Sequence, residues 1–352
     1  MTSDALRYAR QVRLPEVGEA GQRRLSEASV LVVGAGGLGA PALRLLAGAG
    51  VGHIRCLDFD DVNLSNIHRQ TLFTSADVGK AKADAARERL HLVNPSINID
   101  VRAERLTAQN AQSQFDGMDL VLDGSDTFAT RYLVNDASVL TGTPNVFASV
   151  SQFSGQASVF GTAAGPCYRC LFPEPPPAGL IPNCEDGGVL GVVPSLFGTI
   201  QAAEALKLIL RVGTPLVGRL LMVDVLDVTF KEIVVERDPS CPACGVGARP
   251  ITHSADPPEL TVRQLRDQLA GDLPPRLIDV RTREEHGRDN IGGTLIPLDT
   301  LADSLSDLNP SETYVTYCAS GQRSMTAARA LHAAGFDVRT LRGGIEAWRS
   351  TP

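Results

Sequence analysis

The feature that most constrains the fold is a run of glycines, GAGGLG at Gly34–Gly39, between two apolar segments. The preceding Ser29–Val33 has the continuous apolar pattern of a strand buried on both faces, and the following Ala40–Ala49 has the small residues of a packed helix. Glycine lets backbone N–H groups approach an anion, and the helix presents its positive end to it. The segment therefore predicts an α/β fold that binds a phosphate-containing ligand.

An acidic residue follows at the spacing of a dinucleotide-binding unit. Asp58 closes a second predicted strand, His53–Leu57, about twenty residues past the glycines, where a carboxylate accepts hydrogen bonds from ribose hydroxyls. On this pattern alone NAD is the first candidate ligand. A strand–helix turn without a ligand is the simpler alternative, and Asp58 argues against it.

The first 245 residues continue the alternation of strand and helix. Repeated strand–helix–strand segments form a mostly parallel sheet with helices on both faces. From Asn145 on, two strand patterns follow each other closely, which predicts that antiparallel strands continue the sheet. The further elements predicted here are a helix at Lys80–Leu92, strands at Ile97–Val101, Asp119–Leu122, Asn145–Val150 and Gln156–Phe160, and a helix at about Ser195–Arg211.

A smaller unit follows a break in composition. The segment Gly245–Pro258 is rich in glycine, proline and polar residues and lacks apolar periodicity. We interpret residues 246–258 as a linker between domains at 1–245 and 259–352. The second domain shows the pattern of a small α/β fold. Its predicted elements are helices at Thr261–Ala270 and Gln322–Ala334 and strands at Leu277–Val280, Tyr314–Tyr317 and Val338–Leu341.

Composition and charge exclude several classes of protein. The 352 residues are 43% hydrophobic and 21% charged, an ordinary globular balance, and the net charge of −7 argues against nucleic acid as a partner. The polar segment Met1–Gln11 is unlike a signal peptide, and apolar stretches such as Ser29–Gly39 are too short to span a bilayer. We expect a cytoplasmic protein that binds neither nucleic acid nor membrane.

Charged side chains beyond the glycine loop favour ATP over NAD. Arg69, in NLSNIHRQ, and Lys82, which ends VGKAK, are cations that suit the extra charge of a triphosphate. Asp126 follows the predicted strand in DLVLDGSD, where a carboxylate suits Mg²⁺. A dehydrogenase has no need for this cluster, although solvated surface charge is the usual role of residues such as Arg69 and Lys82.

Several motifs in order resemble the molybdopterin-synthase adenylyltransferase and ThiF family, relatives of the ubiquitin-activating enzymes. The resemblance covers about Ala5–Gly245 and rests on RYARQ, GAGGLG, LDFDDVNLSNIHRQ, VGKAKAD, LVLDGSDTFATR, CYRC and CPACG. It implies a Rossmann-like adenylyltransferase domain with one continuous sheet, which works as a homodimer with ATP and Mg²⁺. A carboxylate oxygen attacks the α-phosphorus and pyrophosphate leaves, so catalysis is mainly orientation and charge stabilisation.

The same resemblance implies roles for individual residues. Arg10 resembles an arginine that reaches the ATP of the partner subunit. In this family a cysteine at the position of Cys184 lies over the adenylate and forms a thioester or an acyl disulfide; an incidental loop cysteine is the alternative. The nucleotide-binding positions correspond to Gly37, Asp58, Asn66, Arg69 and Lys82, and the Mg²⁺-linked position to Asp126.

Four of the seven cysteines have the spacing of a metal site. Cys167 and Cys170 form one Cys-x-x-Cys pair, and Cys241 and Cys244 form another. Two such pairs make a tetrahedral site of four thiolates, in which a zinc ion is structural because the protein fills every position. Disulfides or bare thiols are the alternatives, and the odd cysteine count argues against a disulfide framework. Cys56 shares a strand face with Ile54, and we expect it in the core.

Cys318 is predicted to be a nucleophile. It lies between a strand and a helix, where backbone N–H groups and the helix dipole lower the pKa of a thiol, and Arg323 adds a charge that could bind an anionic sulfur donor. With LIDVRTREEH and LRGGIEAW, the CASGQRS loop resembles the rhodanese family over about Leu260–Arg349, which implies a persulfide on Cys318. A phosphatase-like loop is the alternative, and Asn290–Gly293 departs from the usual rhodanese turn.

Together the two domains predict an enzyme that adenylates the C-terminal carboxylate of a small ubiquitin-like sulfur-carrier protein with a Gly-Gly tail. The persulfide then converts this carboxylate to a thiocarboxylate, for molybdopterin, thiamin, cysteine or tRNA thiolation. The sulfur donor is expected to be a cysteine desulfurase or thiosulfate. An NAD-dependent oxidoreductase and a non-catalytic carrier-binding scaffold are the two rival functions.

Overall fold

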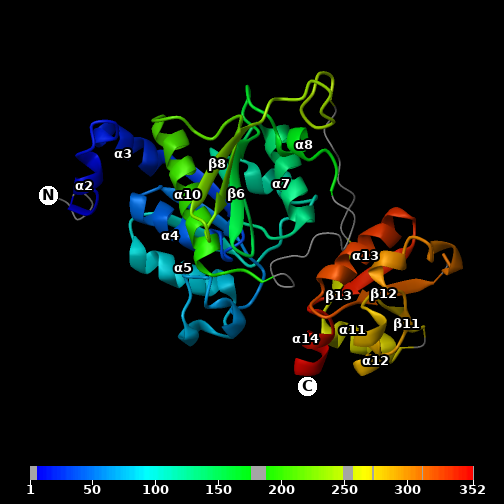
Figure 1. Cartoon of the computed structure of the whole chain (residues 1–352). Helices are drawn as coiled ribbons and strands as arrows, with labels where there is room; N and C mark the ends of the chain where they lie inside the picture. Colours follow the sequence, from blue (N-terminus) through cyan, green and yellow to red (C-terminus); the bar gives the residue numbers. More distant parts are fainter. Residues whose placement is uncertain (1–5, 176–187, 249–256, 272, 311, 352) are drawn as a thin grey trace. The chain divides into compact units, whose positions relative to one another are not determined.

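The computed structural model describes residues 6–175, 188–248, 257–271, 273–310 and 312–351. The described residues divide into two compact units, of which the first ends before residue 249 and the second begins at residue 257 (Figure 1). Each unit has its own sheet and its own hydrophobic core.

The first unit is built on an eight-stranded sheet in the order β3-β2-β1-β4-β5-β6-β7-β8. The strands from β3 to β5 pair in parallel, and β6, β7 and β8 continue the sheet in antiparallel pairs. This arrangement confirms the predicted fold class. The strands are β1 (Ser29–Val33), β2 (His53–Leu57), β3 (Asn98–Arg102), β4 (Leu120–Asp123), β5 (Asn145–Ser151), β6 (Ser154–Phe160), β7 (Arg219–Asp224) and β8 (Thr229–Val234).

Helices cover both faces of the parallel part because its strands are apolar on both faces. Val30 and Val32 of β1 belong to the core beneath α4, α5 and α10, while Leu31 and Val33 face the core formed with α6 and α7. The helices of this unit are α2 (Ala9–Val12), α3 (Gly18–Glu27), α4 (Gly39–Ala49), α5 (Lys82–Val93), α6 (Ala111–Phe115), α7 (Phe128–Thr141), α8 (Tyr168–Leu171) and α10 (Val192–Leu210).

The longest of these helices, α10, is long and apolar enough to cross a membrane by length and composition alone. In the structure it packs against α4, β5 and β6, and Figure 1 shows it beside α4 and β6. Its polar residues Gln201 and Glu204 are buried there, and the Gln201 side chain donates to the backbone carbonyls of Asp123 and Val146, both at 2.8 Å. These contacts are those of a core helix.

The strand order reverses between β1 and β4, since β1 leads to β2 on one side and pairs with β4 on the other. In open parallel sheets, ligands bind outside the carboxyl ends of the strands at such a reversal. The glycine loop after β1 and residues 124–126 after β4 therefore lie at the expected place for a ligand.

The second unit has a five-stranded sheet in the order β11-β10-β12-β13-β9, in which all pairs are parallel. Separate apolar clusters line its two faces, one with α13 and the other with α11 and α14. Its elements are β9 (Glu259–Leu260), α11 (Val262–Leu269), β10 (Arg276–Asp279), α12 (Arg283–Arg288), β11 (Thr294–Leu295), β12 (Thr313–Tyr317), α13 (Gln322–Ala333), β13 (Asp337–Leu341) and α14 (Gly344–Ser350).

Candidate functional site

The turn of the glycine loop requires glycine at two positions, Gly34 and Gly39. Gly34 has a φ of +93°, and a Cβ on Gly39 would lie 1.8 Å from the Gly34 carbonyl oxygen. A Cβ on Gly34 would lie 3.1 Å from the carbonyl oxygen of Gly124, in the turn after β4. The loops that follow β1 and β4 are therefore in direct contact at the strand reversal.

Asp58 holds this loop in place through two hydrogen bonds. Its Oδ2 accepts from the Ala35 N–H at 2.8 Å and its Oδ1 from the Asp60 N–H at 2.9 Å. The side chain is buried, and this burial raises the pKa of Asp58, although Lys82 opposes the shift. The predicted contact of Asp58 with a ribose stays a prediction.

Lys82 lies among three carboxylates. Its ammonium is 3.1 Å from Oδ2 of Asp60, and its side chain is only 5% exposed. Burial acts to lower the pKa of Lys82, but the charges of Asp58, Asp60 and Asp126 together raise it. The structure thus brings three of the predicted residues, Asp58, Lys82 and Asp126, into one electrostatic cluster.

Gly37 and Arg69 lie next to the start of α10, and Asn66 is joined to the glycine loop through Gln70, whose Nε2 would lie 3.9 Å from a Cβ on Gly36. A Cβ on Gly37 would lie 3.0 Å from Cβ of Pro194 and 3.7 Å from Cγ of Arg69. The Asn66 side chain accepts from Nε2 of Gln70 at 3.1 Å. The predicted nucleotide-binding residues of this segment therefore lie around the glycine loop.

Arg10 lies in α2, and its side chain is exposed. Its predicted reach to a partner subunit stays a prediction. Cys184 lies outside the described residues.

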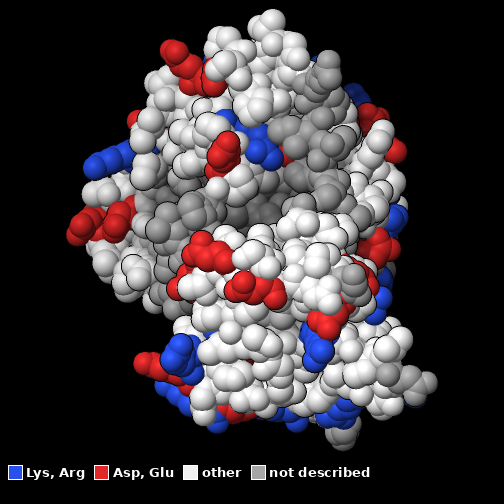
Figure 2. All heavy atoms as spheres, turned by 90° about the vertical axis from the view of Figure 1, so that its right-hand side faces the viewer, with Lys and Arg blue, Asp and Glu red and all other residues white. Residues whose placement is uncertain are grey.

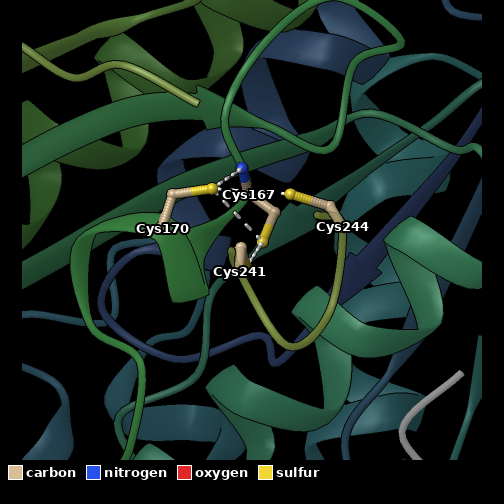
Figure 3. A group of neighbouring side chains, drawn as sticks. All are labelled: Cys167, Cys170, Cys241 and Cys244. Atoms are coloured by element: carbon tan, nitrogen blue, oxygen red, sulfur yellow. Dashed lines mark hydrogen bonds between the residues drawn. The ribbon is translucent and has the colours of Figure 1, made fainter. Parts of the chain in front are cut away.

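The four cysteines of the two Cys-x-x-Cys pairs converge, as Figure 3 shows. Their sulfur atoms all lie within 4.8 Å of one another, with Cys167 and Cys241 at 3.6 Å and Cys170 and Cys244 at 3.4 Å. In a tetrahedral zinc site with Zn–S bonds of about 2.3 Å, the sulfur atoms lie roughly 3.8 Å apart. The donor set and its spacing therefore fit zinc.

Two of these thiols, Cys167 and Cys244, are hard to deprotonate without a cation. Burial and the neighbouring cysteines raise the pKa of Cys167, and burial raises that of Cys244 to about 11. A bound metal ion removes the repulsion between thiolates and deprotonates the ligands.

The residues between the first two cysteines attach the cluster to α7, a contact that the sequence analysis did not predict. The guanidinium of Arg169 bonds both carboxylate oxygens of Asp136, each at 2.7 Å. The Tyr168 N–H donates to Oδ1 of Asn135 at 2.7 Å. All of these groups are buried, so the cluster is fixed to the helix that begins directly after Asp126.

In the second unit, Cys318 follows β12 and lies before α13. Its Sγ accepts from the Gly321 N–H at 3.1 Å, and the residue is 1% exposed. The start of α14 holds this loop through two backbone hydrogen bonds. The Ile345 N–H donates to the Cys318 carbonyl at 2.8 Å, and the Glu346 N–H donates to the Ala319 carbonyl at 3.1 Å.

Glycine is required at this contact. Gly344 has a φ of +57°, and a Cβ there would lie 2.3 Å from the Cys318 carbonyl oxygen and 2.4 Å from that of Ala319. The motif LRGGIEAW therefore matters because its backbone supports the loop of Cys318.

The structure also gives Arg323 a partner that the sequence analysis did not predict. Its two terminal nitrogens lie 2.8 and 2.6 Å from the two carboxylate oxygens of Glu285, on α12. A second network was likewise not predicted: buried Asp279 accepts from Arg281 at 2.7 Å and lies 2.8 Å from Nδ1 of His286. The only earlier signal for these residues was their place in LIDVRTREEH.

Two protein-family models match this chain, one over each of the two units. The ThiF family model matches residues 8–243, and the rhodanese-like domain model matches residues 261–351. The probable adenylyltransferase/sulfurtransferase MoeZ of Mycobacterium tuberculosis is 44% identical over 98% of this chain and 93% of its own. The sulfur carrier protein adenylyltransferase of Thermus thermophilus is 51% identical over 68% of this chain and 90% of its own.

Among solved structures, Escherichia coli MccB in its complex with MccA-N7isoASN matches with a TM-score of 0.61 at 22% identity. The match covers 68% of this chain and 74% of that chain, and it supports the fold. The resemblance stated from the motifs is confirmed. The chain belongs to the ThiF family and carries a rhodanese-like domain at residues 261–351.

Proposed function

We propose that this protein uses ATP to adenylate the C-terminal carboxylate of a ubiquitin-like sulfur-carrier protein and then converts it to a thiocarboxylate. The observation that supports the proposal is that one chain carries two arrangements: Lys82 among three carboxylates near the strand reversal of the first unit, and the cysteine loop after β12 in the second. A relative aligned over 98% of the chain is named for both activities.

In the first unit, the backbone of the glycine loop, Arg69 and Lys82 bind the phosphates of ATP. Asp126 holds Mg²⁺, which supplies positive charge at the phosphates when bound. The carrier carboxylate attacks the α-phosphorus, and pyrophosphate leaves. We propose that the chain forms a homodimer in which Arg10 adds its charge at the partner subunit's ATP. The four-cysteine cluster holds a structural Zn²⁺ ion.

In the second unit, the thiolate of Cys318 takes a sulfane sulfur from a donor, either a cysteine desulfurase or thiosulfate, and becomes a persulfide. Its terminal sulfur attacks the carbonyl of the acyl adenylate, AMP leaves, and an acyl disulfide forms. Cys184 either accepts the carrier as a thioester or attacks this disulfide. In the second case the thiocarboxylate is released, and a cellular thiol reduces the disulfide that remains.

We further propose that residues 246–258 link domains at 1–245 and 259–352, and that the protein works in the cytoplasm without a nucleic-acid or membrane partner. The net charge of −7 supports the part of the proposal that concerns nucleic acid. Figure 2 shows both acidic and basic side chains on the surface.

The test is mass spectrometry of Gly-Gly-tailed carriers after incubation with the enzyme, ATP, Mg²⁺ and a sulfur source. A gain equal to the replacement of one oxygen by sulfur identifies the product. Asp126→Asn should abolish both ATP–pyrophosphate exchange and the product, whereas Cys318→Ala should abolish only the product. Tight binding of NAD, together with no exchange for any carrier, would exclude the proposal.

A further inference from the structure

The ion pair between Glu285 and Arg323 bears on the choice of sulfur donor. Arg323 lies in the first turn of α13, five positions after Cys318, and is the residue that the sequence analysis expects to bind an anionic sulfur donor. Both of its terminal nitrogens bond Glu285, at 2.8 and 2.6 Å, in the bidentate geometry of the strong guanidinium–carboxylate pairs.

Glu285 is itself fixed in place. It belongs to a capping box at the start of α12, in which the Thr282 N–H donates to Oε2 of Glu285 at 2.9 Å and the Glu285 N–H donates to Oγ1 of Thr282 at 3.2 Å. Arg323 and this backbone donor lower the pKa of Glu285 to about 2. The carboxylate is therefore ionised at neutral pH, and the pair has no net charge.

The pair is open to solvent, since the side chains of Arg323 and Glu285 are 32% and 29% exposed. A donor that approaches from solvent can therefore meet the carboxylate as well as the guanidinium.

The two kinds of donor differ in charge. With thiosulfate, the Cys318 thiolate attacks the outer sulfur, the S–S bond breaks, and sulfite leaves with two negative charges. With a persulfide donor, the same attack releases a thiolate, which carries one negative charge. Neutralising the positive charge of Arg323 therefore slows the thiosulfate reaction more than the persulfide reaction, because the departing sulfite carries one more negative charge.

Building on the proposed sulfurtransferase function, we propose that Glu285 determines donor specificity by neutralising Arg323, so that Cys318 takes its sulfur from a persulfide in preference to thiosulfate.

The test measures the rate at which the full chain takes up one sulfur atom in a single turnover. Intact-protein mass spectrometry detects this uptake as a gain in mass of one sulfur atom. The donors are thiosulfate and cysteine persulfide, and Cys318→Ala identifies the sulfur that is carried elsewhere. We expect Glu285→Gln to raise the ratio of the thiosulfate rate to the persulfide rate about tenfold, which corresponds to about 1.4 kcal/mol. The matched control is Glu284→Gln, which removes the same charge from an exposed position of the same helix.

Glu285→Asp separates charge from geometry, because it keeps the carboxylate but shortens the side chain; it should restore the wild-type ratio. An unchanged or lower ratio in Glu285→Gln would overturn the proposal, as would an equal effect of Glu284→Gln. If the wild-type chain loads Cys318 from neither donor, the proposed sulfurtransferase function fails instead.

Discussion

Replacing Asp136 by asparagine should destabilise the first unit strongly. The carboxylate and the guanidinium of Arg169 form two bonds of 2.7 Å with side chains only 3% and 10% exposed. Asparagine keeps the shape but removes the charge, which leaves Arg169 buried without its counter-ion. Breaking a buried pair in this way costs about 3–5 kcal/mol. For a unit of this size, 1 kcal/mol lowers Tm by about 2–4 °C, so we expect a decrease of roughly 10 °C.

Differential scanning calorimetry of the full chain measures this shift, and the transition of the second unit serves as an internal reference. The matched control is Asp84→Asn on α5, where the Asp84–Arg87 pair has the same 2.7 Å distance but side chains 66% and 48% exposed. Exposed pairs contribute about 0–1 kcal/mol, so this Tm should change by no more than roughly 2 °C. Equal shifts in the two variants would refute the argument that burial makes the Asp136 pair important.

Three further predictions concern the metal cluster, the cysteine loop and pH. Removing the proposed zinc ion with a chelator should lower the Tm of the first unit alone and add four titratable thiols, counted with a thiol reagent. Gly344→Ala should slow sulfur loading of Cys318 about tenfold or more by displacing its loop, whereas Gly335→Ala, with φ +92° but open space around it, should not; loading is followed by mass spectrometry. Because the pKa of Glu285 falls from 4.5 to about 2 on folding, its contribution to stability is present above pH 4.5 and is lost as pH falls towards 2; acid unfolding of Glu285→Gln should lack this component.

Much of the fold could be predicted because its strands are apolar and short. The predicted bounds of β1 and β2 match the structure to the residue, and Cys56 is fully buried as expected. By contrast, α7 was not predicted, because its buried face includes Asn135 and Asp136, polar residues that interrupt the apolar period of a helix. Their partners lie 33 residues later in the sequence, at a distance that local patterns do not reveal.

The site residues differ in the same way: those in local sequence motifs could be predicted, and contacts between residues far apart in the sequence could not. The spacing of two Cys-x-x-Cys pairs is enough to predict a common ligand, and the four sulfur atoms do lie close together in the structure. The Arg323–Glu285 pair joins residues 38 positions apart, and nothing in either segment specifies it. β8 was not predicted for another reason: all its residues are exposed, so it lacks the alternation that marks a half-buried strand.

In each unit, a cation of the proposed reactive site is paired with carboxylates. Lys82 is surrounded by Asp58, Asp60 and Asp126, and Arg323 is bonded to Glu285. A phosphate that approaches Lys82 therefore meets net negative charge, and binding requires either that Asp60 release the ammonium or that a divalent cation compensate the carboxylates. On this argument ATP alone should bind weakly to the first unit, and Mg²⁺ should strengthen its binding by more than the metal's affinity for free ATP explains.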